Sequence, residues 1–77
     1  MQRKKRTEKL YRRAWQRIMR IHEWIRSGDL PNCVGMAKKL AVAEKTVKRD
    51  VEFMRDSLEL PIEYDAQRYG YFYSKAV

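Results

Sequence analysis

Only three residues, Ala41-Val42-Ala43, separate two segments whose apolar side chains recur at helical spacing. After this joint, Val47, Val51, Met54 and Leu58 follow one another at intervals of four, three and four residues, which places them on one face of a helix. A joint this short forces the two helices to cross steeply. The sequence therefore predicts two packed helices with a sharp corner between them.

The chain upstream of the joint predicts two helices. The first is expected from about Glu8 to Ser27, with a core-facing stripe formed by Leu10, Ala14, Ile18, Ile21 and Ile25. Gly28 supplies the left-handed residue that ends helices. Asn32 is a suitable N-cap for a short second helix over residues 33–40.

Downstream of the joint, the third helix is expected from about residue 44 to Ser57, and Pro61 prevents its continuation. Residues 61–65 and 70–74 are rich in Tyr, Phe and Ile around a polar turn, which predicts a two-stranded hairpin. The predicted fold is mainly α with a small β-hairpin, a winged helix-turn-helix of three helices and a two-stranded wing.

The positive charge is concentrated in the first third of the chain. Residues 1–26 hold ten Lys or Arg and two acids, a net of +8, whereas residues 27–77 hold eight of each sign. Such asymmetry favours a polyanionic partner, nucleic acid before an anionic membrane surface. An arm that only confers solubility is the equally weighted alternative. Residues 1–7 contain no apolar side chain after Met1 and are expected to be a disordered basic arm, leaving residues 8–77 as one domain.

The chain has one cysteine, Cys33, and one histidine, His22. A single cysteine forms no internal disulfide, and neither residue has a partner at metal-ligand spacing or a third member for nucleophilic catalysis. We therefore expect no metal, no cofactor and no enzyme activity. No apolar run approaches a membrane span and no signal peptide is recognisable, so a cytoplasmic protein is expected.

Residues 36–74, MAKKLAVAEKTVKRDVEFMRDSLELPIEYDAQRYGYFYS, resemble the N-terminal DNA-binding domain of bacterial WYL-domain transcriptional regulators, a DeoR-like winged helix. The residues that carry the resemblance are Ala37, the turn 41–43, Thr46-Val47-Lys48-Arg49-Asp50, Pro61 to Asp65, and Tyr69-Gly70-Tyr71-Phe72. RIMRIHEWIRSG, residues 17–28, is similar to the family's first helix. The resemblance implies sequence-specific binding of double-stranded DNA, transcription regulation, and association with the bacterial nucleoid when bound.

The sequence departs from that family in three respects. Ala41 replaces a frequent Gly, and Ala43 replaces the usual Ser at the N-cap of the third helix, at a cost of about 1 kcal/mol. Glu44 places a compensating carboxylate at the helix N-terminus. No WYL ligand-sensing domain is present, so the chain is expected to be the N-terminal part of a longer regulator, with a stand-alone domain as the alternative.

Four residues at the start of the third helix are candidates for DNA base contacts: Lys45, Thr46, Lys48 and Arg49. Lys45 and Arg49 point furthest from the apolar stripe. Candidates for phosphate contacts are Arg3, Lys4, Lys5, Arg6 and, in the hairpin turn, Arg68. The alternative for the third helix is a face that is only solvated, and the alternative for Arg68 is an exposed loop cation without a ligand. Asp50 is expected to pair with an arginine of the first helix, and Phe53 to pack under the wing.

One flank of the first helix carries Trp15, Met19 and His22, which predicts either partial burial against the wing or a subunit or interdomain contact. We expect the isolated domain to be a monomer or weak dimer, with firm dimerisation supplied by a missing C-terminal region or by DNA. Two rival functions remain open. One is a protein-interaction winged helix that binds no DNA; the other is a basic amphipathic binder of membrane surfaces, which would have to withdraw the Leu/Ile stripe from the core.

Overall fold

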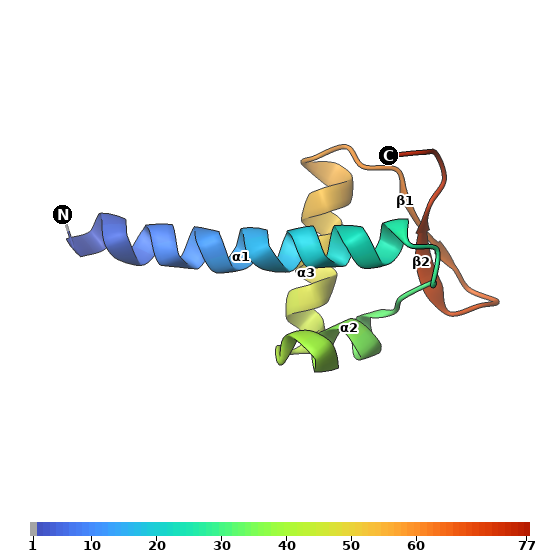
Figure 1. The fold of residues 1–77 in the computed structure, drawn as a ribbon, viewed down its shortest axis with the longest axis horizontal. Helices are drawn as coiled ribbons and strands as arrows, with labels where there is room; N and C mark the ends of the chain where they lie inside the picture. Colours follow the sequence, from blue (N-terminus) through green and yellow to red (C-terminus); the bar gives the residue numbers. More distant parts are fainter. Residues whose placement is uncertain (1) are drawn as a thin grey trace.

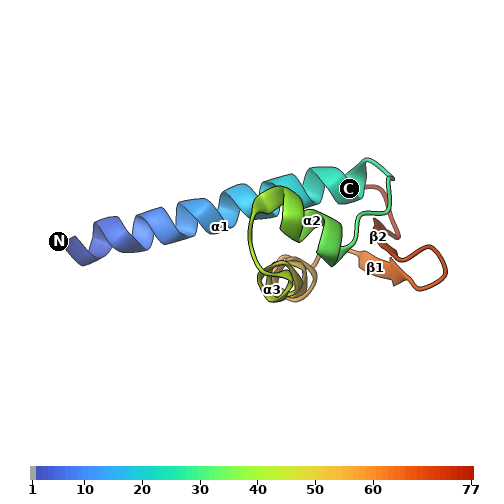
Figure 2. The same ribbon diagram turned by 90° about the horizontal axis from the view of Figure 1, so that it is seen from below.

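Five elements follow one another along the chain. The computed structural model describes the backbone of residues 2–77 and the side chains of residues 11–77. Its elements are α1 (Gln2–Arg26), α2 (Cys33–Leu40), α3 (Glu44–Asp56), β1 (Ile62–Asp65) and β2 (Gly70–Tyr73). Helix α3 crosses α1, α2 lies beside the start of α3, and the hairpin lies near the C-terminal end of α1 (Figures 1 and 2). This arrangement of three helices and an antiparallel hairpin confirms the predicted winged helix-like fold class.

Helix α1 begins earlier than the sequence pattern predicts. Residues 2–7, expected to precede the helix as a disordered arm, form its first turns in the structure. Lys, Arg and Gln favour helices, and neither Gly nor Pro interrupts residues 2–10, so the helix extends beyond its apolar stripe. Figures 1 and 2 show the N-terminal half of α1 projecting past the other elements. Met1 lies outside the described residues.

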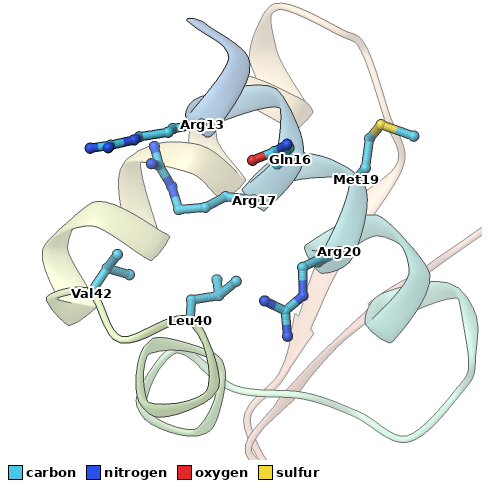
Figure 3. Close-up of a pocket in the computed structure, with 7 residues that line it drawn as sticks. All are labelled: Arg13, Gln16, Arg17, Met19, Arg20, Leu40 and Val42. Carbon is cyan, nitrogen blue, oxygen red and sulfur yellow. The ribbon is translucent and has the colours of Figure 1, made fainter. Parts of the chain in front are cut away.

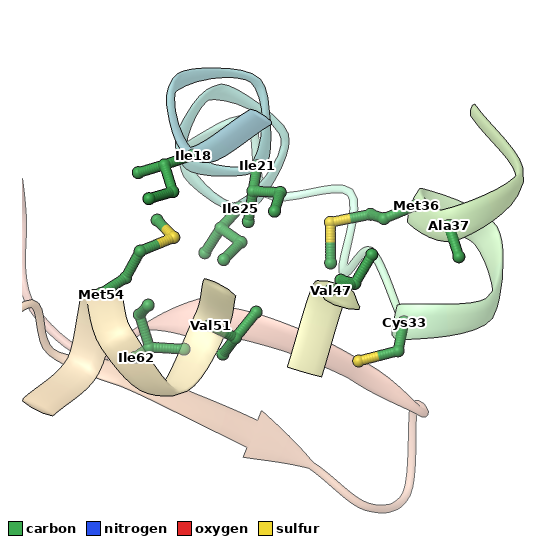
Figure 4. Packing of buried hydrophobic residues seen from close by; sticks show 10 residues of the cluster. All are labelled: Ile18, Ile21, Ile25, Cys33, Met36, Ala37, Val47, Val51, Met54 and Ile62. Atoms are coloured by element: carbon green, nitrogen blue, oxygen red, sulfur yellow. The ribbon is translucent and has the colours of Figure 1, made fainter. Parts of the chain in front are cut away.

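The core lies where α1, α2 and α3 meet and is closed by the first strand (Figure 4). Its buried apolar residues are Ile18, Ile21, Ile25, Cys33, Met36, Ala37, Val47, Val51, Met54 and Ile62. Leu40, at the end of α2, and Val42, in the turn, pack against this cluster. Leu58 is 37% exposed because α3 ends before it, and Leu60 packs against the core instead. The side chain of Leu10, predicted for the core stripe, lies outside the described side chains.

Helix α2 has a side-chain cap at its start, as the sequence predicts, and a left-handed residue at its end. The side chain of Asn32 accepts a hydrogen bond of 2.8 Å from the backbone N–H of Gly35, which caps the first turn. At the other end Ala41 is left-handed, with φ 56°, and its N–H bonds to the carbonyl of Lys38. This left-handed residue turns the chain directly into α3. Gly28 similarly ends α1, with φ 84°.

The hairpin is antiparallel and attached to the loop between α1 and α2. Ile62 pairs with Tyr73 and Asp65 with Gly70. The N–H of Tyr71 donates a 2.8 Å hydrogen bond to the carbonyl of Pro31. A Cβ atom on Gly70 would overlap the backbone of Leu30, so only glycine permits this close approach. The loop therefore holds the hairpin at a defined position beside the helices.

Among residues 2–77, no helix combines the length and the apolar character needed to cross a membrane.

Replacing Ala43 by Ser should stabilise the domain. Ala43 is the N-cap of α3, has extended backbone angles (φ −71°, ψ 150°) and makes no side-chain capping bond. A serine hydroxyl there would accept a hydrogen bond from a first-turn N–H, raising the free energy of unfolding by about 1 kcal/mol. Urea unfolding measures the difference, and Ala66→Ser in the exposed hairpin turn is the matched control. Equal effects of the two substitutions would show that the cap is not the cause.

Candidate nucleic-acid interface

The inward face of α3 determines which side chains it presents to solvent. Val47, Val51 and Met54 are buried against the other helices, and Asp50 is buried beside α1. At about 100° per residue, Arg49 lies about 100° and Lys45 about 140° around the helix axis from Asp50. Both cations are exposed. The packing of α3 thus directs the cations of its first two turns away from α1.

An ion pair between α1 and α3 reinforces this orientation. Arg17 Nε donates to Asp50 Oδ2 at 2.7 Å, and Arg17 Nη2 donates to Asp50 Oδ1 at 3.1 Å. The side chains are only 24% and 10% exposed. The hydrogen bond with Asp50 raises the pKa of Arg17, and the charge of Asp50 adds to this, while desolvation opposes it. The prediction that Asp50 pairs with an arginine of the first helix is confirmed.

The four predicted base-contact residues do not share one environment. Lys45 and Arg49 are exposed, whereas Thr46 is half-buried. Lys48 is also exposed but lies at a groove between α3 and the hairpin. Among the side chains of residues 11–77, the ion pairs involve other cations: Arg17, Arg26, Arg55 and Arg68. The start of α3 therefore presents three cations with no carboxylate within ion-pair distance in this part of the chain.

The groove beside Lys48 has a volume of about 410 Å³ and is rich in tyrosine. Tyr64 and Tyr71, which pair across the two strands, pack edge to face with ring centroids 5.1 Å apart. Tyr69, at the start of the returning chain, is exposed on the same groove. Tyr64 is about half exposed, so its ring forms part of the groove surface. Lys48 of α3 and the tyrosines of the hairpin therefore lie on one surface.

Arg68 lies on a different side of the hairpin. It is exposed and lines a hollow with Gly28, Leu30 and Phe72 rather than the tyrosine groove. Its Nε is 3.7 Å from an Asp65 carboxylate oxygen, a loose surface pair. Asp65 also accepts hydrogen bonds from the backbone N–H groups of Gln67 and Arg68, which shapes the turn. The structure therefore separates Arg68 from the cations of α3. The predicted phosphate contacts Arg3, Lys4, Lys5 and Arg6 have side chains outside those described.

The flank of α1 predicted either to be partly buried against the wing or to contact a subunit or domain is partly occupied within the domain. His22 Nδ1 and the Tyr73 hydroxyl share a hydrogen bond of 2.8 Å. Trp15 packs edge to face on Phe53, with ring centroids 6.2 Å apart. The prediction that Phe53 packs under the wing is wrong, because Phe53 lies on the α1 side of α3 and is 41% exposed. Met19 remains 65% exposed.

The two potential ligand residues are both bonded to tyrosines. Cys33 Sγ lies 3.4 Å from the Tyr71 hydroxyl, and His22 bonds to Tyr73. Burial and the bond to Cys33 raise the pKa of Tyr71, and burial followed by the charge of Glu23 raises that of Tyr73. Both phenols therefore stay protonated well above neutral pH. These contacts attach the returning strand to α1 and α2.

A second basic surface was not assigned from the sequence. Arg13, Arg17 and Arg20 recur at intervals of four and three residues, which places them on one flank of α1. In the structure they face the turn before α3 and line a groove with Leu40 and Val42 (Figure 3). The arginine spacing was visible in the sequence, but the element opposite it was not.

Comparisons with protein-family models, curated proteins and solved structures find no match to this chain.

The pair between Arg17 and Asp50 should contribute measurably to stability. In a double-mutant cycle with Arg17→Ala and Asp50→Ala, we expect a coupling free energy of about 2 kcal/mol, because the pair is bidentate and largely shielded from water. The matched control is the cycle for Arg26 and Glu23, an exposed pair 3.2 Å apart, with an expected coupling below about 0.5 kcal/mol. Urea unfolding measures both. Equal coupling in the two cycles would contradict a special role for Asp50.

Proposed function

We propose that this domain binds double-stranded DNA by placing the start of α3 in the major groove. The observation that carries the proposal is a set of exposed cations, Lys45, Lys48 and Arg49, on the outward side of a helix that follows a tight turn. None of the three has an ion-pair partner among the described side chains. A helix of this kind fits the major groove, and Lys or Arg side chains can donate to guanine or to phosphate oxygens. Lys45 and Arg49 supply base contacts, and Lys48 acts beside the hairpin.

The charge along α3 limits the contact to its first two turns. Glu52 and Asp56 are exposed on the later part of the helix. Their carboxylates would lie near phosphates if the whole helix entered the groove, and like charges repel. The N-terminal end therefore enters the groove while the C-terminal end tilts away, which is the docking geometry of helix-turn-helix proteins.

The biological role that fits this interface is that of the DNA-binding domain of a bacterial transcriptional regulator acting in the cytoplasm. The likeness of residues 36–74 to the DNA-binding domains of WYL-domain regulators supports it, and so does the winged layout. In such a regulator, phosphate contacts supply most of the affinity and the start of α3 supplies specificity.

A protein-contact function has one specific observation in its favour. Trp15 and Phe53 form an exposed aromatic pair, and Met19 is exposed on the same flank of α1. This surface would serve a second subunit or a further domain of a regulator, and it leaves the outward face of α3 uncovered. Insertion of α1 into a membrane surface is disfavoured, because Ile18, Ile21 and Ile25 are held in the core.

Replacing Lys45 or Arg49 by Ala should weaken binding to a duplex selected from a random pool. Where the substitution removes a bidentate contact with a base, the free energy of binding should become less favourable by about 1–3 kcal/mol. Both side chains are exposed, so the melting temperature should stay unchanged. Lys75→Ala, which removes the same charge from the exposed C-terminal segment, is the matched control. Fluorescence anisotropy gives the affinities, and repeating the selection with each variant shows whether site preference changes.

If both variants bind the selected duplex as tightly as the Lys75 variant and keep the original site preference, α3 is not the recognition element. An absence of salt-dependent binding to any duplex by the unmodified domain would contradict DNA binding altogether and favour the protein-contact function.

A further inference from the structure

A basic groove lies between α1 and the turn that leads into α3 (Figure 3). Its volume is about 500 Å³. Leu40 and Val42 line it from one side, and the α1 residues that line it are Arg13, Gln16, Arg17, Met19 and Arg20. The groove thus combines guanidinium and amide donors with a small apolar wall. None of these residues belongs to the recognition surface on α3.

Two of the three arginines at this groove are free to bind a ligand. Arg17 is committed to Asp50 by two hydrogen bonds. Arg13 and Arg20 are exposed, and among the described side chains neither has a carboxylate within ion-pair distance. The guanidinium carbon of Arg20 lies 5.0 Å from the centroid of the Trp24 ring, which restrains its position. Lys39 Nζ lies 5.2 Å from the same ring and adds positive charge nearby.

The groove is within reach of the DNA edge that α3 would approach. Val42 precedes Lys45 by three residues, so their Cα atoms are at most about 11 Å apart. The major groove of B-DNA is about 12 Å wide and bordered on both sides by phosphates. If the Lys45 side chain reaches base edges, Val42 must lie near one sugar-phosphate border of the groove. The arginines that face Val42 then lie near the same border.

We infer that Arg13 and Arg20 bind backbone phosphates on one border of the major groove that α3 enters. This inference rests on the proposed DNA-binding function and adds a second contact surface to it. Guanidinium groups donate two parallel hydrogen bonds to phosphate oxygens, and Gln16 supplies a further amide donor. Leu40 and Val42 provide apolar contact for the deoxyribose ring beside the phosphate. Helices α1 and α3 then both contact the duplex, and part of the excess positive charge of α1 neutralises phosphates of the DNA backbone.

The salt dependence of binding tests this inference. Each phosphate contact contributes about 0.9 to the slope of log K against log salt concentration, so Arg13→Ala/Arg20→Ala should make the slope shallower by about 2. Affinity should fall equally for the selected duplex and a scrambled one, because phosphate contacts carry no sequence information. The matched control is Arg12→Ala, an exposed arginine of α1 that does not line the groove; it should leave the slope unchanged. The single variants, each with a slope change of about 1, give the same readout if the double variant is destabilised.

A second readout locates the contact on the DNA. Single methylphosphonate substitutions, each removing one phosphate charge from the selected duplex, should weaken binding of the unmodified domain at one or two adjacent positions on a groove border. The Arg13/Arg20 double variant should be insensitive at those positions. Site preference should remain that of the unmodified domain, in contrast to the Lys45 and Arg49 variants.

Three outcomes would overturn the inference while leaving the proposed function standing. One is a slope equal to that of the Arg12 variant, and another is an unchanged methylphosphonate pattern in the double variant. The third is a double variant that binds DNA as the unmodified domain does but no longer binds poly-glutamate. This result would assign the groove to an acidic protein segment. Failure of the unmodified domain to bind any duplex would reject both the inference and the proposed function.

Discussion

The ion pair between Arg17 and Asp50 is the contact on which the arrangement of the basic surfaces depends. It joins the middle of α1 to the middle of α3 through two hydrogen bonds at a site largely shielded from water. Together with the buried Val47, Val51 and Met54, the pair fixes the rotation of α3 about its axis, so that Lys45 and Arg49 point to solvent. It also neutralises an acid that would otherwise stand beside the cations of α3. The acid Asp50 is thus paired with Arg17 away from water, while the cations at the start of α3 remain on the exposed surface.

Helix α1 has two parts, one that packs in the core and one that carries much of the positive charge of the chain. Only Ile18, Ile21 and Ile25 of its described side chains are buried, and these lie in its C-terminal half. Figure 1 shows the N-terminal half of α1 projecting from the body. The groove with Arg13 and Arg20 lies where the projecting part meets the turn before α3. Two basic surfaces on different helices thus converge near one short turn, Ala41–Ala43.

The parts of the fold that depend on local rules were predictable from the sequence. The bounds of α2 agree with its predicted range, because Asn32 and the short joint mark its ends. The partner of Asp50 was predicted as an arginine of the first helix, since a carboxylate at the edge of an apolar stripe needs one. The start of α1 was placed too late because an apolar stripe marks where a helix is buried and not where it begins.

Features that depend on how elements face each other were not predictable. Helical spacing places Phe53 on a flank of α3, but it does not say whether α1 or the hairpin lies beside that flank. The structure shows α1 there, with Trp15. The groove at Arg13 and Arg20 was missed for the same reason, because its other wall comes from Leu40 and Val42 of a separate segment. The tyrosine groove beside Lys48 likewise requires the position of the hairpin, which Gly70 and the Leu30 backbone determine.

The central claim is that the start of α3 enters the major groove of duplex DNA, and NMR titration tests it most directly. In spectra of the ¹⁵N-labelled domain, addition of the selected duplex should shift the backbone signals of residues 44–49 most strongly. Signals of Trp15 and Phe53, which pack on each other outside both basic surfaces, should remain nearly unchanged. Shifts concentrated at Trp15 and Phe53, with residues 44–49 unaffected, would contradict the account.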